Sequence, residues 1–230
     1  MPIKKCPVAR LFMVLLVSAW LVPASRADTI YLGSDGGGCR ELRPFGCPNS
    51  FGSSFAFRSS LQSHQVEDFE DMAVGSVPES GVRFGVVEAS ITGSGQVSEI
   101  QGESDPGAYP MSGTRFFLID SPTGQFTLTL SSPADAIGFH ATDIGDLGAE
   151  LTVILDGTRE FPIELGTYGI SGSAVFFGIV SESGPFSTVT VRPEHHPEDG
   201  WGIDDLMIGW TGILIPAETG NWGNLKVRYR

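Results

Sequence analysis

The chain has 230 residues, with 27 acidic side chains against 14 basic ones and a formal net charge of −13. A surface of this sign repels the phosphates of nucleic acids and anionic membranes, which argues against either as a partner. The length suits a single domain with a hydrophobic core and at most a short appendage.

Residues 1–27 have the three parts of a secretory signal peptide. A basic start at residues 4–10 precedes an apolar run at residues 11–22, and small residues lead to a predicted cleavage site after Ala27. The apolar run is shorter than the roughly 20 residues of a membrane span, so a retained anchor is the less favoured alternative. Cleavage removes four basic and no acidic side chains and takes the net charge from −13 to −17.

Residues 28–64 form a Gly-rich stretch with little hydrophobic periodicity, and we predict an irregular segment here. It contains Cys39 and Cys47, the two cysteines that remain after signal cleavage. In an exported protein such a pair predicts a disulfide, and closing a loop this short would add about 2.5 kcal/mol of stability in the chain-entropy model. Metal binding by two cysteines without a nearby histidine is less favoured.

Residues 65–212 are predicted to form a single β-domain. Short runs rich in β-branched and aromatic residues recur between Gly, Pro, Ser and Asp clusters, and several alternate apolar and polar residues, as in Phe126-Thr127-Leu128-Thr129-Leu130. Asp156-Gly157 between two such runs predicts a β-hairpin. No segment after the signal shows helical periodicity over ten or more residues. About ten strands at this spacing indicate an all-β antiparallel sandwich, jelly-roll or lectin-like, with a barrel as the alternative.

Three motifs keep a recognisable order along this domain. They are "VEDFEDMAVGSVPESGVRFG", "AIGFHATDIGDLGAELTVILDG" and "GWGIDDLMIG", and together they cover roughly residues 66–210. In this respect the chain resembles exported bacterial β-sandwich proteins of the PEP-CTERM-associated type. The resemblance implies export and a sandwich fold, and it implies no particular reaction.

The C-terminal tail, residues 213–230, departs from that resemblance. It has a Pro-Ala-Glu sequence and a basic end, but no hydrophobic helix between them. We therefore expect no stable membrane anchor after signal cleavage, and a secreted, extracellular or periplasmic protein.

Asp204 and Asp205 lie side by side in the last predicted strand. Successive residues of a strand point to opposite faces, so the two carboxylates are expected to point apart and to form no catalytic dyad. Asp204 is then either a buried acceptor that ties down a neighbouring loop or a ligand of a structural calcium ion, since calcium prefers carboxylate and carbonyl oxygens. Its predicted partners are Glu70 and, with the same strand parity, Asp68. No other cofactor is expected.

Aromatic residues near predicted loops and strand ends suggest a glycan-binding site. Trp201, Tyr109 and Tyr168 could stack on sugar rings, although for Trp201 taken singly a cap of the hydrophobic core is the favoured alternative. We therefore expect a noncatalytic exported β-sandwich that binds glycan, such as a polysaccharide, or other extracellular-matrix material at or beyond the cell surface. The alternative is an extracellular polysaccharide hydrolase or lyase on a jelly-roll scaffold.

Overall fold

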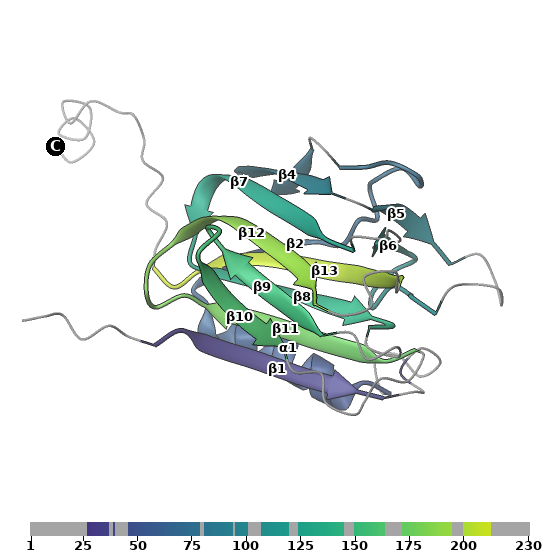
Figure 1. Cartoon of the computed structure of the whole chain (residues 1–230), viewed down its shortest axis with the longest axis horizontal. Coiled ribbons are helices and arrows are strands. Elements are labelled where there is room, and N and C mark those ends of the chain that lie inside the picture. Colours follow the sequence, from purple (N-terminus) through teal and green to yellow (C-terminus); the bar gives the residue numbers. More distant parts are fainter. Residues whose placement is uncertain are drawn as a thin grey trace, which may run out of the picture.

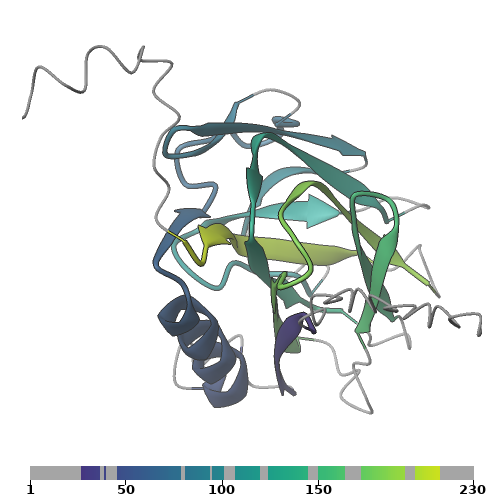
Figure 2. The ribbon, with the colours of Figure 1, turned by 90° about the vertical axis from the view of Figure 1, so that its left-hand side faces the viewer.

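The structure is a computed structural model. It describes residues 27–36, 39, 46–78, 81–93, 95–100, 107–119, 124–144, 150–163, 172–194 and 200–212. Two antiparallel sheets pack face to face and one helix lies against the outside of one of them (Figures 1 and 2). The predicted all-β antiparallel sandwich is confirmed.

The larger sheet, called sheet A, has seven strands. Its order is β1-β11-β8-β13-β6-β5, and β2 pairs with the far end of β13. The bounds are Thr29–Asp35 for β1, Ala174–Val180 for β11, Ala136–Thr142 for β8, Trp201–Trp210 for β13, Arg115–Ile119 for β6, Gln96–Glu99 for β5 and Ser63–Glu67 for β2.

The second sheet, sheet B, has six strands in the order β10-β9-β12-β7-β4-β3. The bounds are Arg159–Ile163 for β10, Leu151–Leu155 for β9, Phe186–Pro193 for β12, Phe126–Ala134 for β7, Val87–Gly93 for β4 and Val82–Phe84 for β3.

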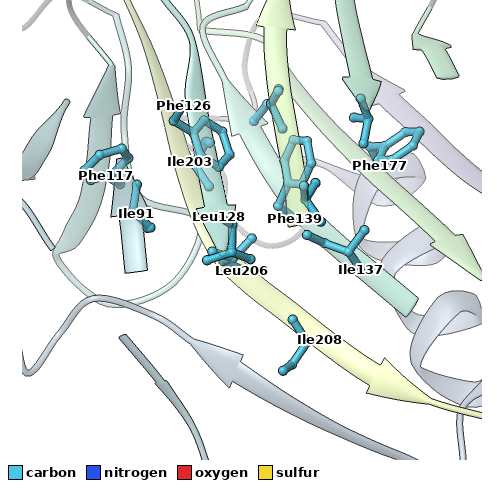
Figure 3. Close-up of a cluster of buried hydrophobic side chains, with 14 of the residues drawn as sticks. Ile91, Phe117, Phe126, Leu128, Ile137, Phe139, Phe177, Ile203, Leu206 and Ile208 are labelled. Atoms are coloured by element: carbon cyan, nitrogen blue, oxygen red, sulfur yellow. The ribbon is translucent and has the colours of Figure 1, made fainter. Parts of the chain in front are cut away.

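The main core lies between the two sheets. Figure 3 shows members of this cluster projecting from β13, β7 and β8, among them Ile203, Leu128 and Phe139. The alternation predicted for β7 is observed, since Leu128 is buried while Thr129 is exposed on the outer face. One parity of the strand therefore supplies the core and the other supplies a polar surface.

Each short run predicted to be a strand between residues 65 and 212 overlaps at least one observed strand. The run at residues 81–93 is a hairpin, β3–β4, that turns at Gly85, whose φ of +62° favours glycine. The predicted Asp156-Gly157 hairpin joins β9 to β10, with both turn residues at positive φ. Strand β5 and strand β1 had not been predicted.

The prediction of an irregular segment at residues 28–64 is wrong, because this stretch contains β1, helix α1 (Pro48–Ser60) and β2. The predicted disulfide between Cys39 and Cys47 is present. The helix escapes a periodicity search because two of its three buried side chains are serines, Ser50 and Ser54. Small polar residues let the helix approach the sheet without giving an apolar stripe in the sequence.

Two features attach α1 to sheet A. The Asp35 carboxylate at the end of β1 accepts hydrogen bonds from the N–H groups of Asn49 and Ser50 in the first helical turn, at 3.1 and 2.7 Å. The Phe57 ring packs on the cross-strand pair Gly138 and Gly178, where an added Cβ would lie 2.8 and 2.7 Å from ring carbons. Figure 2 shows the helix beside strand β1.

The predicted signal peptide and the tail at residues 213–230 lie outside the described residues, apart from Ala27. The described part of the chain contains no helix with the length and apolarity needed to span a bilayer.

Candidate functional site

Asp204 and Asp205 lie at a β-bulge in the middle of β13. The pairing of β13 with β8 shifts register between Asp204 and Met207, and Asp205 has a φ of +47°. The extra residue breaks the alternation of side chains, so both carboxylates bond to the same residue, Ser112. The prediction that they point to opposite faces is therefore wrong.

Asp204 is a fully buried acceptor that holds a loop. One of its carboxylate oxygens accepts the N–H groups of Met111 and Ser112 at 2.7 and 2.8 Å, and the other accepts the N–H of Asp205 at 2.7 Å. Its exposed fraction is 0%. Of the two roles predicted for Asp204, the contacts of a buried acceptor that ties down a neighbouring loop are observed.

Glu70 holds the next part of the same loop. Its carboxylate accepts the N–H groups of Thr114 and Arg115 at 2.7 and 2.6 Å and the Thr114 hydroxyl at 3.2 Å. Gly113 has a φ of +54°, and a Cβ at this position would collide with the Glu70 carboxylate. Residues 111–115, called the clamped loop, are thus fixed by one acid from the start of the domain and one from its end.

The predicted calcium ligands are not gathered around one point. Asp68 is exposed and accepts the N–H of Glu70 in its own turn at 3.2 Å. Within the residues that the structure places, no group of three or more His, Cys, Asp or Glu side chains is arranged to hold a metal ion. Calcium binding by Asp204, Glu70 and Asp68 stays a prediction.

Asp205 faces a buried histidine. One of its carboxylate oxygens lies 3.4 Å from His140 Nδ1, and the other accepts the Ser112 hydroxyl at 2.8 Å. The His140 ring is 1% exposed and packs between Phe51 of α1 and Phe176 of β11. Neither ring nitrogen has a well-aligned hydrogen bond to another described group. His140 is therefore held by aromatic packing and by its 3.4 Å contact with the Asp205 carboxylate.

The two carboxylates have pKa values displaced in opposite directions. Burial, together with the charge of Asp205, raises the pKa of Asp204 well above its ordinary value, although three backbone N–H groups oppose this rise. Burial acts on Asp205 in the same sense, but the contact and charge of His140 and the Ser112 hydroxyl outweigh it and lower the pKa of Asp205.

These directions predict a particular dependence of stability on pH. A raised carboxyl pKa means that the folded state binds the proton more tightly, so the contribution of Asp204 is present at low pH and is lost as the pH rises through the raised value. Asp205 acts in the opposite sense, and its contribution is lost as the pH falls through its lowered pKa. We expect the Asp204→Asn variant to lack part of the wild-type decline in unfolding free energy between about pH 4 and neutrality.

Denaturant unfolding of both proteins across this pH range measures the effect. Burial also raises the pKa of Glu67, so only the difference between the two curves reports on Asp204. Parallel curves would contradict the prediction.

The aromatic residues predicted to bind sugars are not on the surface. Trp201 is 1% exposed and lies in the core between the sheets, with its ring centroid 6.3 Å from that of Phe126. Tyr109 is 0% exposed, and its hydroxyl donates to the carbonyl of Gly172 at 3.0 Å. Neither ring is available for stacking in this conformation, and for Trp201 the core-capping alternative is the observed arrangement. Tyr168 lies outside the described residues.

An accessible cleft lies elsewhere, at the edge of the sandwich where β2 of sheet A meets the β3–β4 turn of sheet B. It has a volume of about 420 Å³, and we call it the rim cleft. None of its lining residues carries a charge; they are Gln62, Ser63, Gln65, Phe84, Gly85, Val86, Trp210 and Gly212. Ring edges, amides and a hydroxyl thus meet in one hollow of an otherwise acidic protein.

Trp210 forms part of this cleft from the end of β13. Its indole N–H donates to the carbonyl of Pro133 at 3.1 Å, and 5% of the residue is exposed. Gln65 is exposed and its side chain lies over Gly85, where an added Cβ would be 3.2 Å from the amide carbon. The sequence signals for this site were Trp210 at a strand end and two glutamines, which are far apart in the chain.

No known family profile matches the sequence, and no curated protein sequence matches it. Among solved structures, the chain is similar to the K2 cleaved adhesin domain of Lys-gingipain, with a TM-score of 0.40 and 12% identity over 64% of this chain and 97% of that one. It is similar to the C-terminal family 22 carbohydrate-binding module of Clostridium thermocellum Xyn10B, with a TM-score of 0.36 and 16% identity over 68% and 98% of the two chains.

The catalytic domain of a GH87 alpha-1,3-glucanase matches 65% of this chain and 28% of its own, with a TM-score of 0.35 and 13% identity. These likenesses are too distant to place the chain in a family or to assign it a ligand.

Proposed function

We propose that the protein is an exported, noncatalytic β-sandwich that binds glycan or other extracellular-matrix material through the rim cleft. The observation that carries the proposal is the lining of this cleft, in which the exposed Val86 supplies apolar surface beside the largely buried Trp210 and Gln65 supplies an amide, without any charged side chain. Sugar recognition needs this combination of apolar contact with CH groups and hydrogen bonds to hydroxyls. The volume of about 420 Å³ is in the range of small-ligand pockets.

Export is supported by the signal-peptide pattern of residues 1–27 and by the disulfide between Cys39 and Cys47, since such bonds persist in oxidising compartments. A noncatalytic role is supported by Asp204, because both of its carboxylate oxygens already accept backbone N–H groups. A general acid must be free to reach its substrate.

One observation favours the alternative, a polysaccharide hydrolase or lyase. The pKa values of Asp204, raised by burial, and Asp205, lowered overall by His140, are displaced apart, and glycosidases assign their acid and base roles in this way. Release of reducing ends from a polysaccharide, lost in the Asp205→Asn variant, would establish the alternative and overturn the noncatalytic proposal.

A glycan array probed with the purified protein tests binding. We expect binding to at least one class of neutral glycan, weakened about tenfold by Gln65→Ala, which corresponds to the loss of a hydrogen bond worth about 1.4 kcal/mol. Gln96→Ala is the matched control, since Gln96 is an exposed amide on β5 away from the cleft. Absence of binding to every glycan, or equal loss in both variants, would overturn the proposal.

The calcium hypothesis for Asp204, Glu70 and Asp68 has its own test. Calcium at about a hundred times its Kd would stabilise the fold by about 2.7 kcal/mol, so excess EDTA is expected to lower the melting temperature. Scanning calorimetry with and without EDTA measures this, with added magnesium as the control for ionic strength. An unchanged melting temperature would remove the hypothesis.

A further inference from the structure

A second hollow lies on the outer face of sheet B, on the other side of the β3–β4 hairpin. Its volume is about 480 Å³, and we call it the face hollow. Hydroxyl groups from two neighbouring strands line it, among them those of Ser90, Thr129 and Ser131. Arg83 and Glu88, an exposed ion pair with atoms 3.6 Å apart, complete its edge.

The β3–β4 hairpin separates this hollow from the rim cleft. Phe84 and Gly85 line the rim cleft, whereas Arg83 and Glu88 line the face hollow. This division follows from strand geometry, because Arg83 and Phe84 are successive residues whose side chains point to opposite sides. One short hairpin therefore contributes to both sites.

The turn between the two hollows presents an exposed apolar group. Val86 is 92% exposed, the largest exposed fraction among the exposed large hydrophobic residues of the described chain. It follows Gly85 at the tip of the hairpin and also lines the rim cleft. An exposed apolar side chain beside hollows that also contain amides and hydroxyls suits a ligand that carries CH groups along its length between hydroxyls.

We propose that the rim cleft and the face hollow are two subsites of one extended surface that binds several consecutive residues of a neutral polysaccharide, with the chain crossing the β3–β4 turn at Val86. This inference rests on the proposed glycan-binding function and adds the length and charge class of the ligand.

The charge class follows from the lining of both subsites. The rim cleft has no charged side chain, and Arg83, the one cation at the face hollow, is paired with Glu88. With a net charge of −13 the protein repels uronate and sulfate groups, and neither subsite has an unpaired cation to offset that repulsion. Hydroxyls and amides, which both donate and accept hydrogen bonds, match the hydroxyls of a neutral sugar.

The expected length of the ligand follows from the arrangement of the subsites. Two separate hollows of about 420 and 480 Å³ on either side of a hairpin cannot both be filled by one or two sugar residues. Linked subsites increase affinity, because the second contact is made at a high effective concentration. Affinity should therefore rise with the number of sugar residues.

Calorimetric titration with dimers, tetramers and hexamers of cello-, xylo- and mannooligosaccharides tests this expectation. For the series that binds, we expect the hexamer to bind at least about tenfold more tightly than the dimer. A hexamer that binds no more tightly than the dimer would overturn the inference.

A pair of double variants locates the second subsite. Ser90 and Thr129 are cross-strand partners in the face hollow, and Ser90→Ala with Thr129→Ala is expected to reduce hexamer affinity about tenfold and leave dimer affinity unchanged. Thr92→Ala with Thr127→Ala removes the next cross-strand pair on the same face of the same strands, outside the hollow, and should change neither affinity.

The outcomes separate the two proposals. If Gln65→Ala weakens binding but the Ser90/Thr129 double variant binds the hexamer like the wild type, glycan binding stands and the second subsite is refuted. If no oligosaccharide and no glycan on the array binds, the proposed function itself fails. Tighter binding of polyuronates than of neutral polymers would overturn the assignment of charge class.

Discussion

The Asp204→Ala variant is expected to lose about 4 kcal/mol of unfolding free energy, since removal of a buried acceptor leaves its three hydrogen-bond partners unpaired. Three backbone N–H groups, those of Met111, Ser112 and Asp205, would lose an acceptor whose own side chain is fully buried. The clamped loop would lose its attachment to Asp204 and keep those to Asp205 and Glu70. Denaturant unfolding at constant pH measures the difference.

Asp71→Ala is the matched control, because Asp71 is an exposed aspartate for which a change within about 0.5 kcal/mol is expected. If Asp204→Ala fails to fold, Asp204→Asn keeps the shape and one carbonyl oxygen and should show an intermediate loss. A loss below about 1 kcal/mol for Asp204→Ala would show that the three hydrogen bonds do not hold the loop.

Phe57→Ala is expected to lower the unfolding free energy by about 3–5 kcal/mol, as do other truncations of a buried phenylalanine. The Phe57 ring is 0% exposed. It fills the space that Cβ atoms would occupy if Gly138 and Gly178 were larger residues. Its removal would leave a cavity between α1 and sheet A. Loss of helical signal in far-ultraviolet circular dichroism at lower denaturant would accompany the loss of stability.

Phe55→Ala on the same helix supplies the control. Phe55 is 69% exposed, so a change within about 0.5 kcal/mol is expected. Equal effects of the two substitutions would mean that the helix is held by its Asp35 contacts and not by the Phe57 ring.

The strands were predictable wherever a sheet has one wet face. In β7 the alternation in Thr127-Leu128-Thr129 indicates both that the segment is a strand and which side chains face the core. Strand β1 lacks that signal, because Ile30 and Leu32 are 49% and 44% exposed at the edge of sheet A and its sequence does not separate two faces.

The bulge at Asp205 could not be predicted from parity, since a strand pattern assumes one residue for each partner on the neighbouring strand. The local signal was the Asp-Asp pair itself, as aspartate adopts positive φ more readily than most residues. This single irregularity reversed the expected direction of one carboxylate. The acceptor role of Asp204, by contrast, followed from the cost of burying a charge without partners.

The rim cleft and the face hollow were beyond local pattern analysis. Gln65, Gly85 and Trp210 come from three separate parts of the sequence and meet only because β2 pairs with the end of β13 and lies near β3. Trp201 and Tyr109, predicted to bind sugars because they lie near loops, are buried, because the type of ring alone does not distinguish a sugar platform from a core cap.

Strand β13 has a consequence for how the chain reaches its folded state. It lies between β8 and β6 and pairs with β2, yet it is the last strand in the described part of the chain. Until residues 201–210 have been synthesised, β1, β11 and β8 have no link to β6 and β5, and residues 111–115 lack their acceptor Asp204. Sheet A therefore closes only after residues 201–210 have been synthesised, so its two halves cannot join in the order in which the chain is made.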